Sequence, residues 1–128
     1  MIIDILEALK GLVENYCNAN GIDCVVSIMP DATAINNDKW YFFVDIDEIN
    51  YVKNTSISVG ATYDIKIGIA KRVNNYREFI SGISLFIDEL CRHIMTTIAV
   101  TQLTIGEYGY DEVNKVGALS IVAKVGVE

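Results

Sequence analysis

The feature of this sequence that most constrains its fold is a strict alternation of side-chain types between Ile57 and Ala70. Apolar residues and one tyrosine occupy every second position, with small or polar residues between most of them: Ile57, Val59, Ala61, Tyr63, Ile65, Ile67 and Ile69 alternate with Ser58, Gly60, Thr62, Asp64, Lys66, Gly68 and Ala70. Successive side chains of a β-strand point to opposite faces of its sheet. A period of two therefore predicts one long strand with a buried face and a face that is wet or lightly covered.

Four further segments have the composition of strands, being rich in β-branched and aromatic residues. They are Cys24–Met29, Lys39–Val52, Thr97–Gly106 and Val116–Val127. The second of these alternates so that Trp40, Phe42, Val44 and Ile46 share one face while Tyr41, Phe43, Asp45 and Asp47 share the other. Two polar segments, Asp31–Asp38 and Glu107–Lys115, are predicted to be loops.

Two segments have the three- and four-residue spacing of an amphipathic helix. The first is Ile2–Tyr16, and Asn20-Gly21 after it tolerates the left-handed conformation that ends helices. The second runs from Asn75 to Ile94, where Asn75 and Glu78 have the spacing of a capping pair.

The predicted order is therefore α-β-β-β-α-β-β in a single domain, residues 1–128. Strands interrupted by one helix favour an α+β fold in which two helices pack on one face of a mainly antiparallel five-stranded sheet. Two helices cover only part of such a sheet, so its far face and edges are left to water or to neighbouring chains.

The composition fits a protein whose surface is partly covered by other protein chains. The sequence is 52% hydrophobic, and its mean hydropathy is +0.32. Monomers rarely expose large apolar patches, so some of this excess is expected to lie at an interface, the alternative being a β-rich core of isoleucine and valine. The net charge is −7, and the deficit lies in the first half of the chain. The one basic cluster, Lys71, Arg72 and Arg77, is too small to predict nucleic-acid binding.

The three cysteines are an odd number without zinc-site spacing, which suits a reducing compartment. Asp4 and Glu7 interrupt the first apolar run, and no stretch approaches the roughly 18 apolar residues that span a bilayer. We expect a cytosolic protein that does not enter membranes and leaves a cell only by lysis.

No catalytic, cofactor or metal site is predicted. Cys91 and His93, the only histidine, lie two residues apart on a helix and so point in different directions. Asp45 and Asp47, with Glu48 beside them, resemble a weak cation site, but no calcium-loop pattern surrounds them and an acidic surface strand is the better interpretation. Gly-rich phosphate loops and nucleophile-elbow motifs are absent from the sequence.

Protein interfaces are the remaining candidates. Small residues on the outward face of the long strand allow another backbone to approach closely, although an exposed face also needs no bulk. That face supplies the candidate subunit interface, which comprises Ser58, Gly60, Thr62, Asp64 and Lys66. Charge and tyrosines in polar segments supply the candidate partner-facing residues, which are Asp31, Asp38, Asp45, Asp47, Tyr108, Tyr110 and Asp111.

The order of elements resembles that of the tail terminator, or tail completion, proteins of long-tailed bacteriophages. The resemblance covers nearly the whole chain and is carried by four features: the opening helix Ile2–Tyr16, the run ATYDIKIGIAKRV at Ala61–Val73, the helix REFISGISLFIDELCRHI at Arg77–Ile94, and the hairpin from Thr101 to Val127.

This resemblance implies a virion protein that is assembled in the host cytoplasm, is not an enzyme and needs no cofactor. It implies a ring of identical copies, six-fold by expectation, that caps the tail tube, ends its polymerisation and joins the tail to the head–neck complex. Two alternatives remain at this point: another phage neck or adaptor protein of similar topology, and a small-molecule-binding α+β domain with a pocket between sheet and helices.

Overall fold

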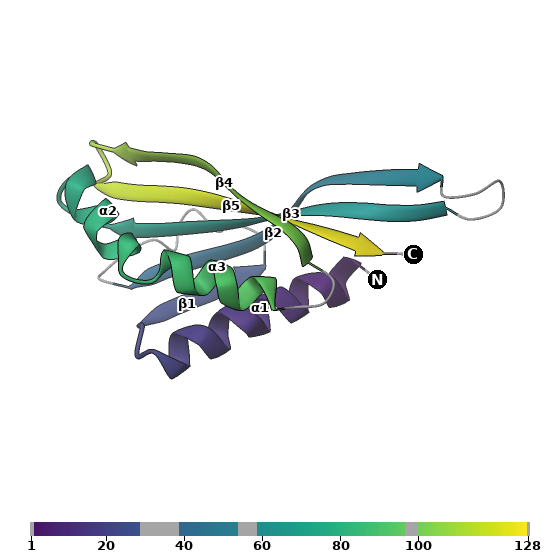
Figure 1. Cartoon of the computed structure of the whole chain (residues 1–128). Coiled ribbons are helices and arrows are strands. Elements are labelled where there is room, and N and C mark those ends of the chain that lie inside the picture. The colour runs from purple at the N-terminus through teal and green to yellow at the C-terminus, as the bar shows by residue number, and fades with distance from the viewer. Residues whose placement is uncertain (1, 29–38, 54–58, 97–99, 128) are drawn as a thin grey trace.

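The computed structural model describes residues 2–28, 39–53, 59–96 and 100–127. Within them the chain forms three helices and five strands (Figure 1). In chain order these are α1 (Ile2–Ala19), β1 (Cys24–Ile28), β2 (Trp40–Lys53), β3 (Val59–Arg72), α2 (Tyr76–Ser84), α3 (Ile87–Met95), β4 (Val100–Asp111) and β5 (Val116–Val127).

The five strands form one sheet in the order β1-β2-β3-β5-β4. Three of its four pairings are antiparallel, as the sequence predicts. The exception is β1, which runs parallel to β2 with Cys24 opposite Trp40. A parallel pair requires a crossover of about a dozen residues, and the segment between Ile28 and Trp40 is long enough to provide one. The sheet is therefore mixed.

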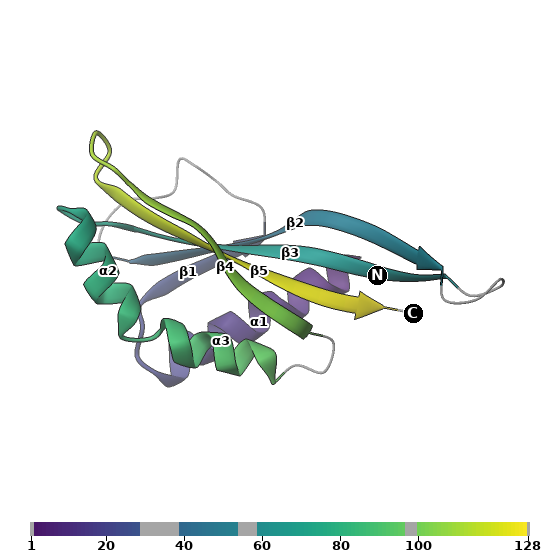
Figure 2. The same cartoon turned by 45° about the horizontal axis from the view of Figure 1, so that its top comes forward.

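All three helices lie on the same side of the sheet (Figures 1 and 2), which confirms the predicted layers. The α1 helix ends where expected, because Gly21 has a φ of 67° and the Ile22 amide donates to the Cys17 carbonyl at 2.9 Å. At the start of α2, the Glu78 amide donates to the side chain of Asn75 at 2.9 Å, and the Glu78 carboxylate accepts from the Asn74 amide at 3.1 Å.

The predicted second helix is divided into α2 and α3, which corrects the expected number of helices from two to three. Ser81, Gly82 and Ser84 before the break are weak helix formers. At the break Leu85 is 84% exposed, whereas the Phe86 ring is buried edge-on against Trp40, with ring centroids 4.9 Å apart. Trp40 also lies against Gly82, where an added Cβ would be 3.1 Å from the indole. Burial of Phe86 and Trp40 thus accompanies the interruption.

The core lies between the helices and one face of the sheet, and the predicted apolar faces fill it. Burial of such side chains is the main favourable term in folding. The largest of its completely or almost completely buried side chains are Leu9, Val13, Phe42, Val44, Ile65, Ile67, Ile69, Phe79, Leu90, Ile94, Ile121 and Val125.

The closing hairpin is longer than predicted. Residues 107–111 of the expected loop Glu107–Lys115 belong to β4, and the turn is confined to residues 112–115. Tyr108 and Tyr110 pair with Leu119 and Gly117 of β5, so strand pairing prevails over the polar composition of this segment.

A prediction follows from the fit of Gly117 against Phe79, whose ring is fully buried. A Cβ at Gly117 would overlap the Phe79 ring, so Gly117→Ala should destabilise the fold by about 1–3 kcal/mol through overpacking. Gly109→Ala in the same hairpin is the matched control, since nothing lies within 4 Å of its added Cβ. Urea unfolding of both variants measures the difference, and equal midpoints would contradict the packing described here.

Candidate protein-interaction surface

The distal parts of β2 and β3 project beyond the helices as a ribbon (Figures 1 and 2). We call this ribbon the arm and define it as Glu48–Lys53 together with Val59–Asp64, which pair in register from Glu48 opposite Asp64 to Lys53 opposite Val59. On the β3 side the pairing with β5 continues only as far as Ala61 opposite Val127. The tip of the arm beyond Ala61 thus has only two strands, and two-stranded ribbons are marginally stable alone in water. This tip is therefore a segment that a neighbouring surface would stabilise.

A bulge at Asp47 changes how the arm presents its side chains. Ile46 lies opposite Ile65 and Glu48 lies opposite Asp64, so Asp47 is an extra residue without a partner in register. After the bulge Ile49 and Tyr51, rather than even-numbered residues, occupy the helix-side face. Tyr51 is 73% exposed there. The predicted alternation of β2 consequently applies only as far as Ile46.

The candidate subunit interface lies on the helix-free face of the sheet, with the exception of Ser58, which is outside the described residues. Gly60 and Thr62 belong to the arm, and Asp64 and Lys66 follow toward the body of the sheet. Asp64 lies between Glu48 of β2 and Lys124 of β5. Its Oδ1 atom is buried without a hydrogen-bond partner in the described part of the chain.

The acidic partner-facing candidates are only partly placed, because Asp31 and Asp38 fall outside the described residues. Asp45 is half-buried, lies opposite Lys66, and accepts from the Ile46 amide at 2.8 Å. Asp47 is exposed at the bulge. No group of three or more Asp, Glu, His or Cys side chains in residues 2–28, 39–53, 59–96 and 100–127 is arranged to hold a metal ion.

The candidates in the closing hairpin have structural contacts of their own. Asp111 accepts from the Val113 and Asn114 amides at 2.9 and 3.2 Å and from the Asn114 side chain at 2.8 Å. The hydrogen bonds from Asn114, followed by that from Val113, lower the pKa of Asp111. The Tyr110 hydroxyl donates to the Val73 carbonyl at 3.0 Å. Both residues order the hairpin, a role that the Asp-x-x-Asn spacing of a turn indicates in advance.

Tyr108 is the candidate in this hairpin that remains largely exposed, at 66%. Its ring is stacked on that of Tyr76 from α2, with centroids 6.5 Å apart and planes 3° from parallel. It therefore offers a rigid aromatic surface.

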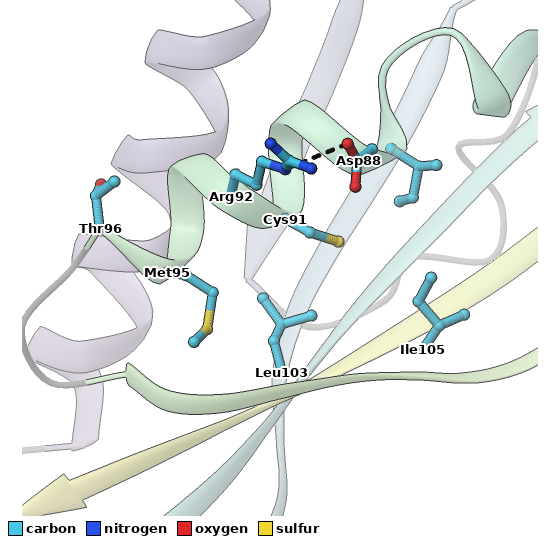
Figure 3. Close-up of a pocket in the computed structure, with 8 residues that line it drawn as sticks. Asp88, Cys91, Arg92, Met95, Thr96, Leu103 and Ile105 are labelled. Atoms are coloured by element: carbon cyan, nitrogen blue, oxygen red, sulfur yellow. Dashed lines mark ion pairs between the residues drawn. The ribbon is translucent and has the colours of Figure 1, made fainter.

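Cys91 and His93 are separated as predicted. His93 faces α1, where its ring centroid is 5.6 Å from that of Tyr16. Tyr16 is buried, and its hydroxyl donates to a Glu89 carboxylate oxygen at 3.1 Å. Burial, followed by the hydrogen bond to Glu89, raises the pKa of Tyr16 to about 12. Cys91 instead points toward β4 (Figure 3).

That side of α3 forms an apolar groove with β4 (Figure 3), which the sequence analysis did not identify. Cys91 and Met95 lie across from Leu103 and Ile105, and the volume is about 540 Å³. An ion pair between Asp88 and Arg92, 3.2 Å apart, borders it. The spacing of Ile87, Cys91 and Met95, four residues apart on one side of the helix, was the available signal. Sequence alone does not show that this secondary stripe lacks complete cover.

None of the helices within the described residues combines the length and apolar composition that crossing a membrane requires.

Compared with models of protein families and with curated proteins, the sequence matches none. Among solved structures it is similar to a chain of the "Virion of native gene transfer agent (GTA) particle". The two chains are 12% identical over 94% of this chain and 84% of the other, with a TM-score of 0.42. A similarity this low assigns neither a fold family nor a function.

A prediction concerns access to the groove. Burial raises the pKa of the Cys17 thiol to about 12, with a further contribution from its hydrogen bond to Cys24. Burial and then Asp88 raise the pKa of Cys91, but Cys91 lines an open groove whereas Cys17 is fully buried. In dilute protein at about pH 8, maleimide should modify Cys91 at least about tenfold faster than Cys17. Peptide mapping identifies the adducts, and Cys91→Ser should remove the fast one. Equal rates would show that the groove is closed.

Proposed function

We propose that this chain is a non-enzymatic structural protein of a phage virion, which forms a ring at the end of the tail tube. The ring, six-fold by expectation, ends polymerisation of the tube and joins it to the head–neck complex. The phage assignment comes from the order of elements in the sequence. The observation that carries the assembly role is a sheet covered by helices on one face only, from which an arm projects.

The helix-free face has the character of a surface that another chain covers. It carries a hollow of about 450 Å³ whose lining includes Phe43, Gly68 and Ala118. Phe43 lies over Gly68, where an added Cβ would meet the ring at 3.8 Å. Apolar hollows of this kind on a sheet face favour contact with protein.

A contact between two different surfaces of the same chain is heterologous, and it closes a ring when the rotation between copies permits. The arm and the sheet edges of this fold are different surfaces, so they suit such a contact. Acidic residues at the base of the arm, Asp45 and Asp47, suit a basic surface on the tube or neck protein.

The ring predicts a definite solution mass. Six copies of a 14.2 kDa chain give a species of about 85 kDa, which should replace the monomer as concentration rises. Light scattering coupled to size exclusion measures the mass, and negative-stain microscopy should show closed rings. A strict monomer at all concentrations would contradict the proposal.

The charge assignment has a separate test. Asp45→Lys combined with Asp47→Lys should slow binding to the tail tube of the same phage about tenfold or more at low salt, and less at high salt. Glu7→Lys on the exposed side of α1 is the matched control and should leave the rate unchanged. Circular dichroism and light scattering establish that the double variant is folded and still forms the ring. Unchanged binding would refute the acidic surface.

A second candidate function is binding of a small molecule, which the groove between α3 and β4 favours because about 540 Å³ is within the usual range of ligand pockets. A strict monomer whose melting temperature rises with a metabolite would support it instead of the ring.

A further inference from the structure

The groove between α3 and β4 borders a sheet edge with which no strand of the described residues pairs. β4 is the outermost strand beyond β5 in the sheet order. In the groove, Ile105 is 50% exposed and Met95 is 42% exposed. Such an edge can accept an additional strand, whose backbone pairs with the edge while its side chains enter the adjoining groove.

The same chain supplies a second free edge with suitable side chains. β1 pairs with β2 only as far as Ile28 opposite Val44, and beyond that point no described strand pairs with the outer side of β2. This outer side runs along the arm. It carries Tyr51, which is among the most exposed large side chains of the described residues at 73%.

The apolar side chains of the two edges lie on the same side of the sheet. Ile49 and Tyr51 lie opposite Tyr63 and Ala61 of β3, so they are on the helix side of the sheet. A separate pairing puts the groove on the same side, since Leu103 and Ile105 of β4 lie opposite Ala123 and Ile121 of β5. If β2 of one copy pairs with the β4 edge of a second copy, the helix-side faces of the two sheets become continuous. Tyr51 of the first copy then enters the groove of the second.

Charge permits this pairing and size favours it. The β4 segment from Val100 to Ile105 contains no charged residue, so Glu48 and Lys53, the two charged residues of the β2 edge in the arm, meet no like charge there. Lys124, next to Gln102 in register, lies on the helix-free side, as does Glu48. The groove volume of about 540 Å³ accommodates an aromatic side chain. Tyrosine buries a large area at a small entropy cost, which makes it a common interface anchor.

We propose that the groove between α3 and β4 binds the arm of a second copy of this chain, with β2 extending the sheet at β4 and Tyr51 in the groove. This proposal deepens the proposed function and rests on it, because it names the contact that joins one copy in the ring to the next. It differs from the interface expected from sequence, which used the outward face of β3.

Disulfide trapping with the native Cys91 tests the contact directly. Ile49→Cys and Tyr51→Cys place a thiol on the helix-side face of the arm, and Asn50→Cys places one on the opposite face. Mild copper–phenanthroline oxidation at a concentration where oligomers form should give a ladder of covalent oligomers with the first two variants on non-reducing gels. Asn50→Cys should give none, and adding Cys91→Ala should abolish the ladder.

A matched pair of tyrosine variants gives an independent measurement. Tyr51→Ser should weaken self-association about tenfold or more, as truncation of an interface anchor does. Tyr108→Ser, at a tyrosine of similar exposure that stacks on Tyr76, should leave self-association unchanged. Light scattering over a concentration series measures both.

The outcomes separate this contact from the function on which it rests. A ring-sized species that forms no ladder and tolerates Tyr51→Ser overturns the groove contact and leaves the ring intact. A chain that is monomeric at every concentration overturns both. If the ladder persists when Cys91→Ala is added to an arm variant, the cross-link involves Cys24 or Cys17. That result also overturns the groove contact.

Discussion

The structure depends on the burial of one face of β3. Ile65, Ile67 and Ile69 lie beneath the helices with exposed fractions of 1% or less, and β3 is paired on both sides, by β2 and β5. The helices, which all lie on that side, complete the core with Phe79, Leu90 and Ile94. The other face of the sheet has no helix on it within the described residues, although Tyr41 and Ala70 on that face are also buried. The proposed assembly role is a consequence of this one-sided cover.

The parts of the fold that sequence predicts well are those set by local pattern. The alternation around Ile65 and the capping pair Asn75 and Glu78 are both present as expected. The features that the sequence does not predict depend on contacts between residues that are distant in the chain. Phe86 against Trp40 accompanies a helix break that periodicity does not signal, and pairing of Tyr108 with Leu119 extends β4 through a polar segment. The parallel pairing of β1 with β2 is likewise a property of the topology, which residue composition does not predict.

Charge and residue type in the sequence indicate the candidate interaction residues, and the structure separates these residues by their other contacts. Asp111 and Tyr110 hold the closing turn and the Val73 carbonyl, so their polar groups have intramolecular partners. Tyr51 and Tyr108 expose most of their rings. The sequence does not predict the groove, because the spacing of Cys91 and Met95 places them beside the buried stripe of α3. Only the position of β4 in the fold leaves these two side chains uncovered. Exposure of an apolar stripe is a tertiary property.

The bulge at Asp47 connects the fold to the proposed contact. Side chains of a strand alternate strictly, so a single extra residue transfers every later side chain to the other face. Before the bulge, Phe42, Val44 and Ile46 face the helices; after it, Ile49 and Tyr51 lie on the same side of the sheet, beyond the helices. In an uninterrupted strand Tyr51 would lie on the helix-free face, and Asn50 would point toward the groove of a neighbouring copy. The extra residue thus gives the arm an apolar side that matches the groove, while the polar Asn50 remains on the helix-free side.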